Sequence, residues 1–479
     1  MSWTIIKSAI GSVVPRWSIV ALLLAALPTE ALAEAPAEAP AEAASTVEFT
    51  PRTPESYVAN RPFLRTSVEI MTFNVSMTVW GHYFIKRDDT GYDVSVNSLT
   101  TNPKFGFQWD NNTFFVNYFR HPYQGAQYYG AGRANGYDYY QSGMWAFAGS
   151  WLFEYMGESK RPSYNDWITS GVGGMALGEP LFRLSSVVLD NEATASSRVL
   201  RELGGLVILP VRGVNRLVTG EAFQVHANPP DRRPNVMNSN IRVGAWKPGD
   251  EQRWDSRQTK AFLGFDVSYG NPFEERVDKP FDVFTSGIDV AFDNEPQALR
   301  RLEVHGLIAG ASIGRGERAQ HVIGAVQSYD YFRNDVYAMG TQSFGASLLS
   351  RFRMGGGFDT RTVVTASWIL LGAANSHYVH VSNRRYDIGP GAAYNLGLQF
   401  LRNERRVIEL GHAGYWIHAL NGTAVNHFIS ISRVKANLML MRFVGIGFEY
   451  FLYTAEKKFK DFPDVYARGS ELRVFMIYR

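Results

Sequence analysis

The chain has 479 residues, no cysteine, and a formal net charge of +3 that comes from 48 basic and 45 acidic residues. The lack of cysteine excludes a lipoprotein attachment site, a disulfide framework and a thiolate metal site. The near balance of charge gives no concentrated basic surface of the kind that nucleic-acid-binding proteins carry, so no nucleic-acid partner is expected.

The N-terminus predicts an export signal. Lys7 and Arg16 precede or flank an apolar run of 11 residues from Trp17 to Leu27, and Ala-Leu-Ala at 31–33 supplies small residues for cleavage. The apolar run is too short for a helix that crosses a bilayer. We therefore predict a signal peptide at 1–33 and, at 34–60, a disordered tether rich in Pro, Ala and Glu.

The next two regions differ in their hydrophobic pattern. Runs between Ser67 and Phe119 alternate apolar and polar residues, so 61–135 is predicted to supply N-terminal β segments. Residues 136–220 lack this alternation and predict an α-helical insert. The pattern at its centre predicts two helices that are joined by a turn at Pro162-Ser163, with Ser163 as the N-cap of the second helix.

Three carboxylates lie in this predicted hairpin. Glu154 comes just before the turn and Asp166 just after it, so an antiparallel hairpin would bring these two side chains together. Glu179 follows Asp166 by 13 residues, about 20 Å along a helix, and belongs at the opposite end. A stripe of small residues on the second helix predicts close helix packing, and its members are Gly171, Gly174 and Gly178.

Residues 221–479 alternate with the period of a β-strand. Val444, Ile446 and Phe448 predict one apolar face, with Gly445 and Gly447 on the other. Long runs of this kind, together with 14% aromatic residues, are typical of an outer-membrane antiparallel β-barrel, here of about 12 strands with a range of about 10 to 16. A soluble β-sandwich is the alternative. Whether the helices would lie in the lumen or in the periplasm stays open.

One part of the chain is similar to a known family. The runs HPYQGAQYYGAGRANGYDYYQSGMWAF from His121, WLFEYMGE, PSYNDWITSGVGGMALGE and LPVRGVNRLVTGE resemble an uncharacterised bacterial envelope family, domain of unknown function 3943, over 114–221. The resemblance implies an exported, outer-membrane protein and supplies no activity. The family's recurring positions fall on His121, Pro122, Gly125, Arg133, Gly136, Glu154, Ser163, Asn165, Asp166, Gly178 and Glu179.

These residues allow two interpretations. A buried carboxylate beside a histidine can act as a general acid or base, which makes His121, Glu154 and Asp166 the catalytic candidates. The other interpretation is a structural polar network, to which Arg133, Ser163, Asn165 and Glu179 are assigned. The structural interpretation is favoured, so an enzyme is the less expected outcome. No cofactor and no metal site is predicted.

Three classes of function follow from the sequence. The first is an outer-membrane barrel of a Gram-negative bacterium with a structural, transport or envelope-organising role. The second is a lipid-directed barrel hydrolase or acyltransferase, and the third is a surface-binding or adhesion barrel. Outer-membrane lipid is the expected partner, with lipopolysaccharide or a small hydrophobic ligand as further candidates. The oligomeric state is left open.

Overall fold

The computed structural model describes residues 61–84, 91–230, 232–249, 259–274, 276–293, 297–378, 384–403 and 405–479. The predicted signal peptide and tether lie outside these residues. The chain divides into two compact units. The helical unit comprises Met1–Gly106, Gln124–Pro162 and Gly178–Pro234, and the barrel unit comprises Phe107–Tyr123, Ser163–Leu177 and Asn235–Arg479.

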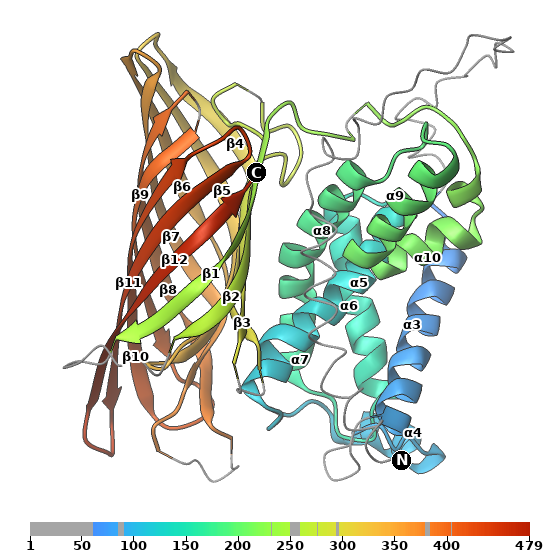
Figure 1. Ribbon diagram of the computed structural model, residues 1–479. Helices are drawn as coiled ribbons and strands as arrows, with labels where there is room; N and C mark the ends of the chain where they lie inside the picture. The colour runs from blue at the N-terminus through green and yellow to red at the C-terminus, as the bar shows by residue number, and fades with distance from the viewer. Residues whose placement is uncertain are drawn as a thin grey trace, which may run out of the picture. The chain divides into compact units, whose positions relative to one another are not determined.

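Helices occupy most of the described chain before residue 224 (Figure 1). None of the helices in the described ranges is long and apolar enough to cross a membrane. The α-helices are α3 (Phe63–Phe84), α4 (Val96–Phe105), α5 (His121–Ala134), α6 (Tyr139–Met156), α7 (Tyr164–Ile168), α8 (Gly174–Val188), α9 (Ala195–Ile208) and α10 (Pro210–Val218). The described residues also form two π-helical turns, η3 (Val116–Arg120) and η4 (Thr169–Gly173), and the short 3₁₀ helix η5 (Glu221–Phe223).

The prediction of β segments over 61–135 is wrong, because this region is helical. In α3 the buried residues are Thr66, Ile70, Asn74 and Gly81, which are four or seven positions apart. That spacing places them on one face of a helix. The β-branched and aromatic residues of α3 favour strands only weakly, and packing against neighbouring helices outweighs this preference. The helical region therefore precedes the first strand of the barrel.

The helix after Ser163 contains an irregular turn. Ser163 caps α7 by accepting a hydrogen bond from the N–H of Asp166 at 3.3 Å, at the position where the sequence predicts a cap. The π-helical turn η4 then joins α7 to α8. Because a π turn holds an extra residue, it rotates the faces of the helix on its two sides relative to one another. A stripe drawn with regular α-helical spacing therefore does not stay on one face.

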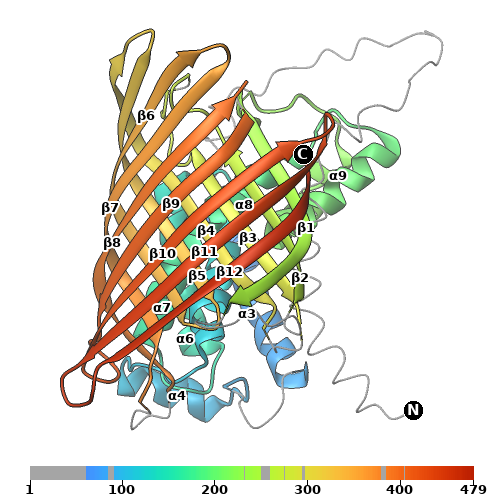
Figure 2. The same ribbon diagram turned by 60° about the vertical axis from the view of Figure 1, so that its left-hand side comes forward.

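The barrel unit contains twelve antiparallel strands, as the sequence predicts. They are β1 (Met237–Gly249), β2 (Lys260–Tyr269), β3 (Phe284–Phe292), β4 (Leu299–Arg315), β5 (Ala319–Arg333), β6 (Ala338–Gly355), β7 (Phe358–Asn375), β8 (Tyr386–Arg402), β9 (Arg405–His418), β10 (Val425–Met439), β11 (Val444–Phe459) and β12 (Val465–Tyr478). Each strand pairs with its neighbour in sequence. The barrel closes where β1 pairs with β12, with Ile241 opposite Tyr478. Figure 2 shows the strands tilted around the barrel, as closure requires.

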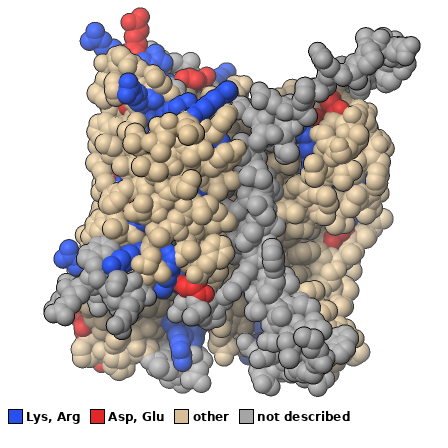
Figure 3. Space-filling model, in the orientation of Figure 1, with Lys and Arg blue, Asp and Glu red and all other residues tan. Residues whose placement is uncertain are grey.

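The two faces of the strands have opposite character, and the predicted alternation is confirmed. In β11, Ile446 and Phe448 are 46% and 42% exposed, whereas Gly447 between them and Glu449 and Phe451 after them are buried. The exposed positions of the other strands are also large and apolar, for example Trp368 and Met476. On the visible face of the barrel, charged residues gather at the two ends and are scarce in the band between them (Figure 3). This is the surface of a barrel that crosses a lipid bilayer.

A charge placed in the middle of this outer face should destabilise the barrel more than one at its end. We expect Ala366→Lys, in the middle of β7, to cost about 2–4 kcal/mol of folding free energy. Phe358→Lys, at the first residue of the same strand, should cost about 1 kcal/mol or less. Both values can be measured by guanidinium titration of the protein folded into lipid vesicles. Equal costs at the two positions would contradict a lipid-facing belt.

Candidate functional site

Two segments of the barrel unit, 107–123 and 163–177, lie on the outer wall of the barrel. Gln327 and Tyr329 of β5 have the same strand parity as Ile323, which is 46% exposed, so all three point away from the lumen. Gln327 Nε2 donates to the carbonyl of Val172 at 3.0 Å, and Tyr329 Oη donates to the carbonyl of Tyr118. These donors fix both segments to the wall.

The π-helical turn η4 receives a second contact from the wall. Gln342 Nε2 of β6 donates to the carbonyl of Thr169 at 3.2 Å. A Cβ on Gly173 would come within 2.7 Å of Gln342 Nε2, and a Cβ on Gly340 within 2.5 Å of the Tyr118 ring. Glycine at these two positions therefore permits the close approach of helix and strand.

Between these segments lies a buried polar site, centred on Asp110 and Asn165. Asn165 Nδ2 donates to Asp110 Oδ1 at 2.7 Å and to Asp166 Oδ1 at 2.7 Å, and Asn165 Oδ1 accepts from the main-chain N–H of Asp110 at 3.1 Å. Asn117 Nδ2 donates to Asp110 Oδ1 at 2.6 Å and to Tyr386 Oη at 2.5 Å. Asn165 and Asn117 are both 0% exposed. One amide in each segment thus holds the Asp110 carboxylate.

His121 joins this polar site through Asp166. Its Nε2 lies 3.5 Å from Asp166 Oδ2, and both side chains are buried. Burial lowers the pKa of His121 to about 4, which the nearby Asp110 carboxylate opposes and Arg120 reinforces. The imidazole is therefore neutral at pH 7. A neutral imidazole beside a carboxylate can accept or relay a proton.

The other predicted residues are placed as follows. Ser163 caps α7, and its Oγ donates to Asn165 Oδ1 at 3.0 Å, so it supports the polar site. Glu154 lies on α6 in the helical unit and is 1% exposed. Its pairing with Asp166 stays a prediction from the hairpin. The same holds for the packing role of Gly171 and Gly174.

Glu179 forms a separate buried cluster in the helical unit. Arg133 Nε lies 2.8 Å from Glu179 Oε2, Arg183 Nε lies 2.8 Å from Glu179 Oε1, and Tyr129 Oη donates to Oε2 at 2.6 Å. Burial alone would raise the pKa of Glu179, but Arg133 and Arg183 outweigh it and hold this pKa below its usual range. A Cβ on Gly178 would come within 2.6 Å of the Tyr129 ring, so this glycine lets α8 approach α5.

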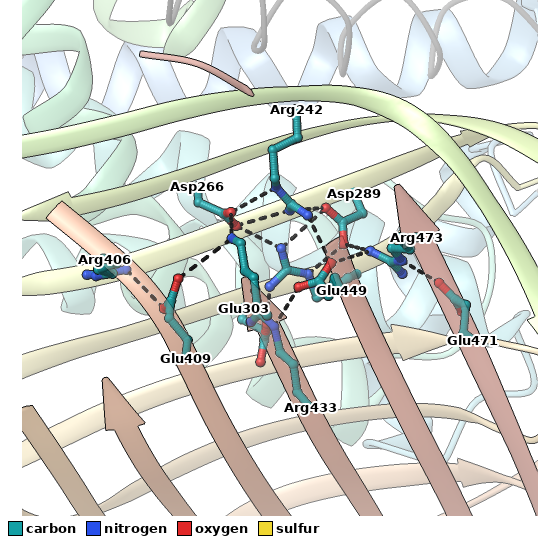
Figure 4. A network of polar contacts seen from close by, with 12 residues as sticks. Arg242, Asp266, Asp289, Glu303, Arg406, Glu409, Arg433, Glu449, Glu471 and Arg473 are labelled. Atoms are coloured by element: carbon teal, nitrogen blue, oxygen red, sulfur yellow. Dashed lines mark hydrogen bonds and ion pairs between the residues drawn. The ribbon is translucent and has the colours of Figure 1, made fainter. Parts of the chain in front are cut away.

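The sequence did not reveal a third cluster, an ion-pair network in the barrel lumen (Figure 4). Arg242 of β1 lies 2.6 Å from Asp289 of β3 and 3.1 Å from Glu449 of β11. Lys435 of β10 reaches Asp266 of β2 at 2.8 Å, across strands that are not neighbours. The network also contains Arg301, Glu303, Arg406, Glu409, Arg433, Glu471 and Arg473. Charges of both signs at lumen-facing positions are the signal that could have predicted it.

Buried apolar side chains also face the lumen. A cluster of buried apolar residues includes Phe332, Met339, Ile417, Phe451 and Tyr453, all from lumen-facing positions. A second apolar cluster contains Trp246, Phe262, Ala291, Phe475 and Ile477. Arg242 and Glu449 are 0% exposed, so solvent does not reach the side chains at the centre of this network. The lumen is therefore filled at the level of this network, whereas lumen-facing residues such as Thr365 and Asn395 are half-buried.

One region of the chain matches a known family model. Residues 106–211 match the family "Domain of unknown function (DUF3943)". This confirms the predicted resemblance, and the match contains the polar site residues His121, Asn165 and Asp166 as well as Glu179. No curated protein matches the chain.

Solved structures that resemble the chain include three barrels. They are the NanC porin (7% identity, 50% of this chain and 100% of that chain covered, TM-score 0.28), the KdgM porin (8%, 50% and 98%, 0.22) and the outer membrane channel DcaP of Acinetobacter baumannii (9%, 50% and 96%, 0.22). At such low identities and scores the likeness carries no conclusion about the activity of this chain.

The pKa of His121 predicts a pH dependence of stability. Its folded value, about 4, lies below the usual value of 6.5, so its contribution is fully present above pH 6.5 and is lost as the pH falls toward 4. We expect the wild type to lose about 3 kcal/mol more than His121→Asn between pH 6.5 and pH 4. Hydrogen exchange of 107–123 at several pH values measures this difference. The exposed His82 is the control, and His82→Gln should behave as the wild type.

The Glu179 cluster predicts a second effect on stability. Removing this carboxylate leaves two buried guanidinium groups without their counter-charge, so Glu179→Gln should destabilise the helical unit by about 3–5 kcal/mol at pH 7. Because the pKa of Glu179 is lowered, the difference between wild type and variant should shrink as the pH falls below the usual value of 4.5 and through the lowered pKa. Hydrogen exchange in α5 and α8 reports both effects. Glu192→Gln, at an exposed acid, should leave exchange there unchanged.

Proposed function

We propose that this protein is an outer-membrane β-barrel with a closed lumen and that its role is structural, to anchor the helical region in the envelope of a Gram-negative bacterium. The lumenal ion-pair network carries this proposal. The network fills the middle of the lumen of a barrel whose outer surface is apolar, like that of a membrane protein.

The membrane location is supported by the outer surface and by the lengths of the strands. A strand that crosses a bilayer needs about 9–11 residues. Strands β6 and β7 have 18 residues each, and β8 has 17. Exposed aromatic side chains such as Trp416 and Tyr466 lie near the ends of their strands, where aromatic residues favour the lipid–water interface.

The closed lumen argues against transport. An open channel needs a continuous path of water, and charged groups that line such a path stay partly hydrated. Here Asp289 and Arg473 are 1% and 3% exposed, and their atoms lie 2.5 Å apart. Removing one partner of such a buried pair costs about 3–5 kcal/mol, because the other charge is left buried without its counter-charge.

The anchoring role is supported by the chain path. The chain passes between the helical unit and the barrel unit at Gly106, Tyr123, Pro162, Leu177 and Pro234. Four of these passages lead into or out of the two segments that the barrel wall holds through Gln327, Tyr329 and Gln342. A barrel that served only as a pore would not need helical segments bound to its outer wall.

A second candidate function is acid–base chemistry on a lipid. The observation that favours it is the neutral imidazole of His121 at 3.5 Å from the carboxylate of Asp166. A hydrolase or acyltransferase would use such a pair to move a proton. In that case the barrel would serve as the membrane anchor of an enzyme.

Conductance separates a closed barrel from a pore. The full-length protein, reconstituted in planar bilayers after its heat-modifiable folded form has been verified, should give no stepwise current above background. Reproducible channel insertions would contradict the proposal. Recovery in the soluble periplasmic fraction would also contradict it, because a barrel with this outer surface belongs in a membrane.

The enzyme candidate is tested in the same strains. Lipid A and phospholipid profiles of cells that carry wild type, His121→Gln or Asp166→Asn should be identical if the role is structural. A lipid species present only with the wild type would favour the enzyme. The variants must reach the outer membrane in equal amounts for this comparison to count.

A further inference from the structure

A cavity of about 570 Å³ lies at one end of the barrel unit. Its walls are the turn between β5 and β6, the residues before and at the start of β8, and the chain from Asn111 to Phe115. All these parts belong to the barrel unit. The cavity is large enough for a small organic anion.

The cavity is rich in positive charge. Three of its lining residues are arginines, namely Arg333, Arg384 and Arg385, whereas Asp335 is the acidic residue among the described lining. Arg385 is exposed, and Arg333, whose Nη1 donates to Gln297 Oε1, is half-buried. Guanidinium groups bind carboxylate and phosphate oxygens in a two-pronged geometry.

The surroundings of Arg384 are the strongest evidence that the cavity binds an anion. It is only 3% exposed, and its guanidinium donates to the carbonyl oxygens of Asp110 at 3.2 Å, Tyr386 at 2.9 Å and Asn421 at 2.7 Å. These partners are neutral oxygens, and within the described residues no carboxylate lies within ion-pair distance of this guanidinium. A buried charge without a counter-charge is costly. An anion in the adjoining cavity would lower this cost.

The other residues of the cavity wall indicate which kind of group is attached to the anion. Phe114, Phe115, Val336 and Tyr337 supply apolar surface, and Asn111 supplies an exposed amide. The cavity lies where the strands end, beyond the apolar belt, which is the level of lipid headgroups. A phosphate group attached to a partly apolar molecule matches this mixture of surfaces.

We propose that this cavity binds a phosphate group through Arg333, Arg384 and Arg385. The phosphate comes from a lipid headgroup or from a soluble phosphorylated compound. The cavity is connected to the polar site by two hydrogen bonds. Tyr386, which lines the cavity, accepts from Asn117 Nδ2 at its Oη, and Arg384 donates to the main-chain carbonyl of Asp110. The proposal holds whether or not the lumen conducts, so its test and the conductance test fail independently.

Calorimetric titration of the full-length protein in neutral detergent tests the site. The probes are inorganic phosphate and a short-chain phosphatidylglycerol, with a short-chain phosphatidylcholine as the zwitterionic comparison. Arg385→Gln should weaken phosphate binding by about tenfold, or about 1.4 kcal/mol. The double variant Arg333→Gln/Arg385→Gln should weaken it further. Arg384 is left unchanged because its removal could disturb the fold.

Arg353→Gln is the matched control, since Arg353 is an exposed arginine at the opposite end of β6. It should bind as the wild type does. Binding of inorganic phosphate and phosphatidylglycerol alike supports a site for phosphate itself, and binding of phosphatidylglycerol alone supports a headgroup site. Binding of neither, equal affinity in wild type and double variant, or an equal loss in Arg353→Gln would overturn the proposal.

Discussion

The structure depends on the compensation of charge inside a closed barrel. Twelve strands leave an interior that side chains can fill, and a charged group in such an interior must meet its counter-charge because water does not reach it. Arg242 meets this requirement by contacting carboxylates from three other strands, Asp266, Asp289 and Glu449. Each of these contacts depends on the register of the strands. The network therefore favours one arrangement of the barrel over the same strands shifted by a residue.

The same principle explains how helical segments can lie on the outer wall. A polar side chain that faces lipid would be costly without a partner. Gln327, Tyr329 and Gln342 instead donate to carbonyls of the segments that cover them. The wall is thus apolar where it is exposed and polar where it is covered. This division of the outer surface fixes the position of the polar site that contains Asp110, His121 and Asp166.

The sequence predicted the barrel because strand periodicity is a local property. Alternation in β8, β11 and β12 can be read from a few neighbouring residues, and the strand count follows from it. Contacts between distant residues could not be read in this way. Asn117 and Tyr386 are 269 positions apart, and no pattern in either segment indicates that they touch. In the lumen network, the charges at lumen-facing positions are a local signal, but which of them pair depends on strands that are far apart in the sequence.

Other parts of the site were predicted in part. His121 and Asn165 came from the family resemblance, Asp166 came from the predicted hairpin, and Ser163 came from its capping pattern. The glycine stripe used regular α-helical spacing, whereas the π turn η4 brings Gly173 to the wall. The β assignment of α3 failed because its β-branched residues and its helical packing point to different structures. Tertiary contacts decided between them.

The long separation of these contacts has a consequence for assembly. Helices such as α3 and α6 form from local contacts, whereas the barrel closes only when β1 meets β12, with partners 237 positions apart at Ile241 and Tyr478. The donors that hold segments 107–123 and 163–177 lie 155 to 211 positions after the carbonyls they contact. The contacts of these two segments with the wall therefore need β5 and β6 in place. These contacts can form only when the barrel strands are paired in the correct register.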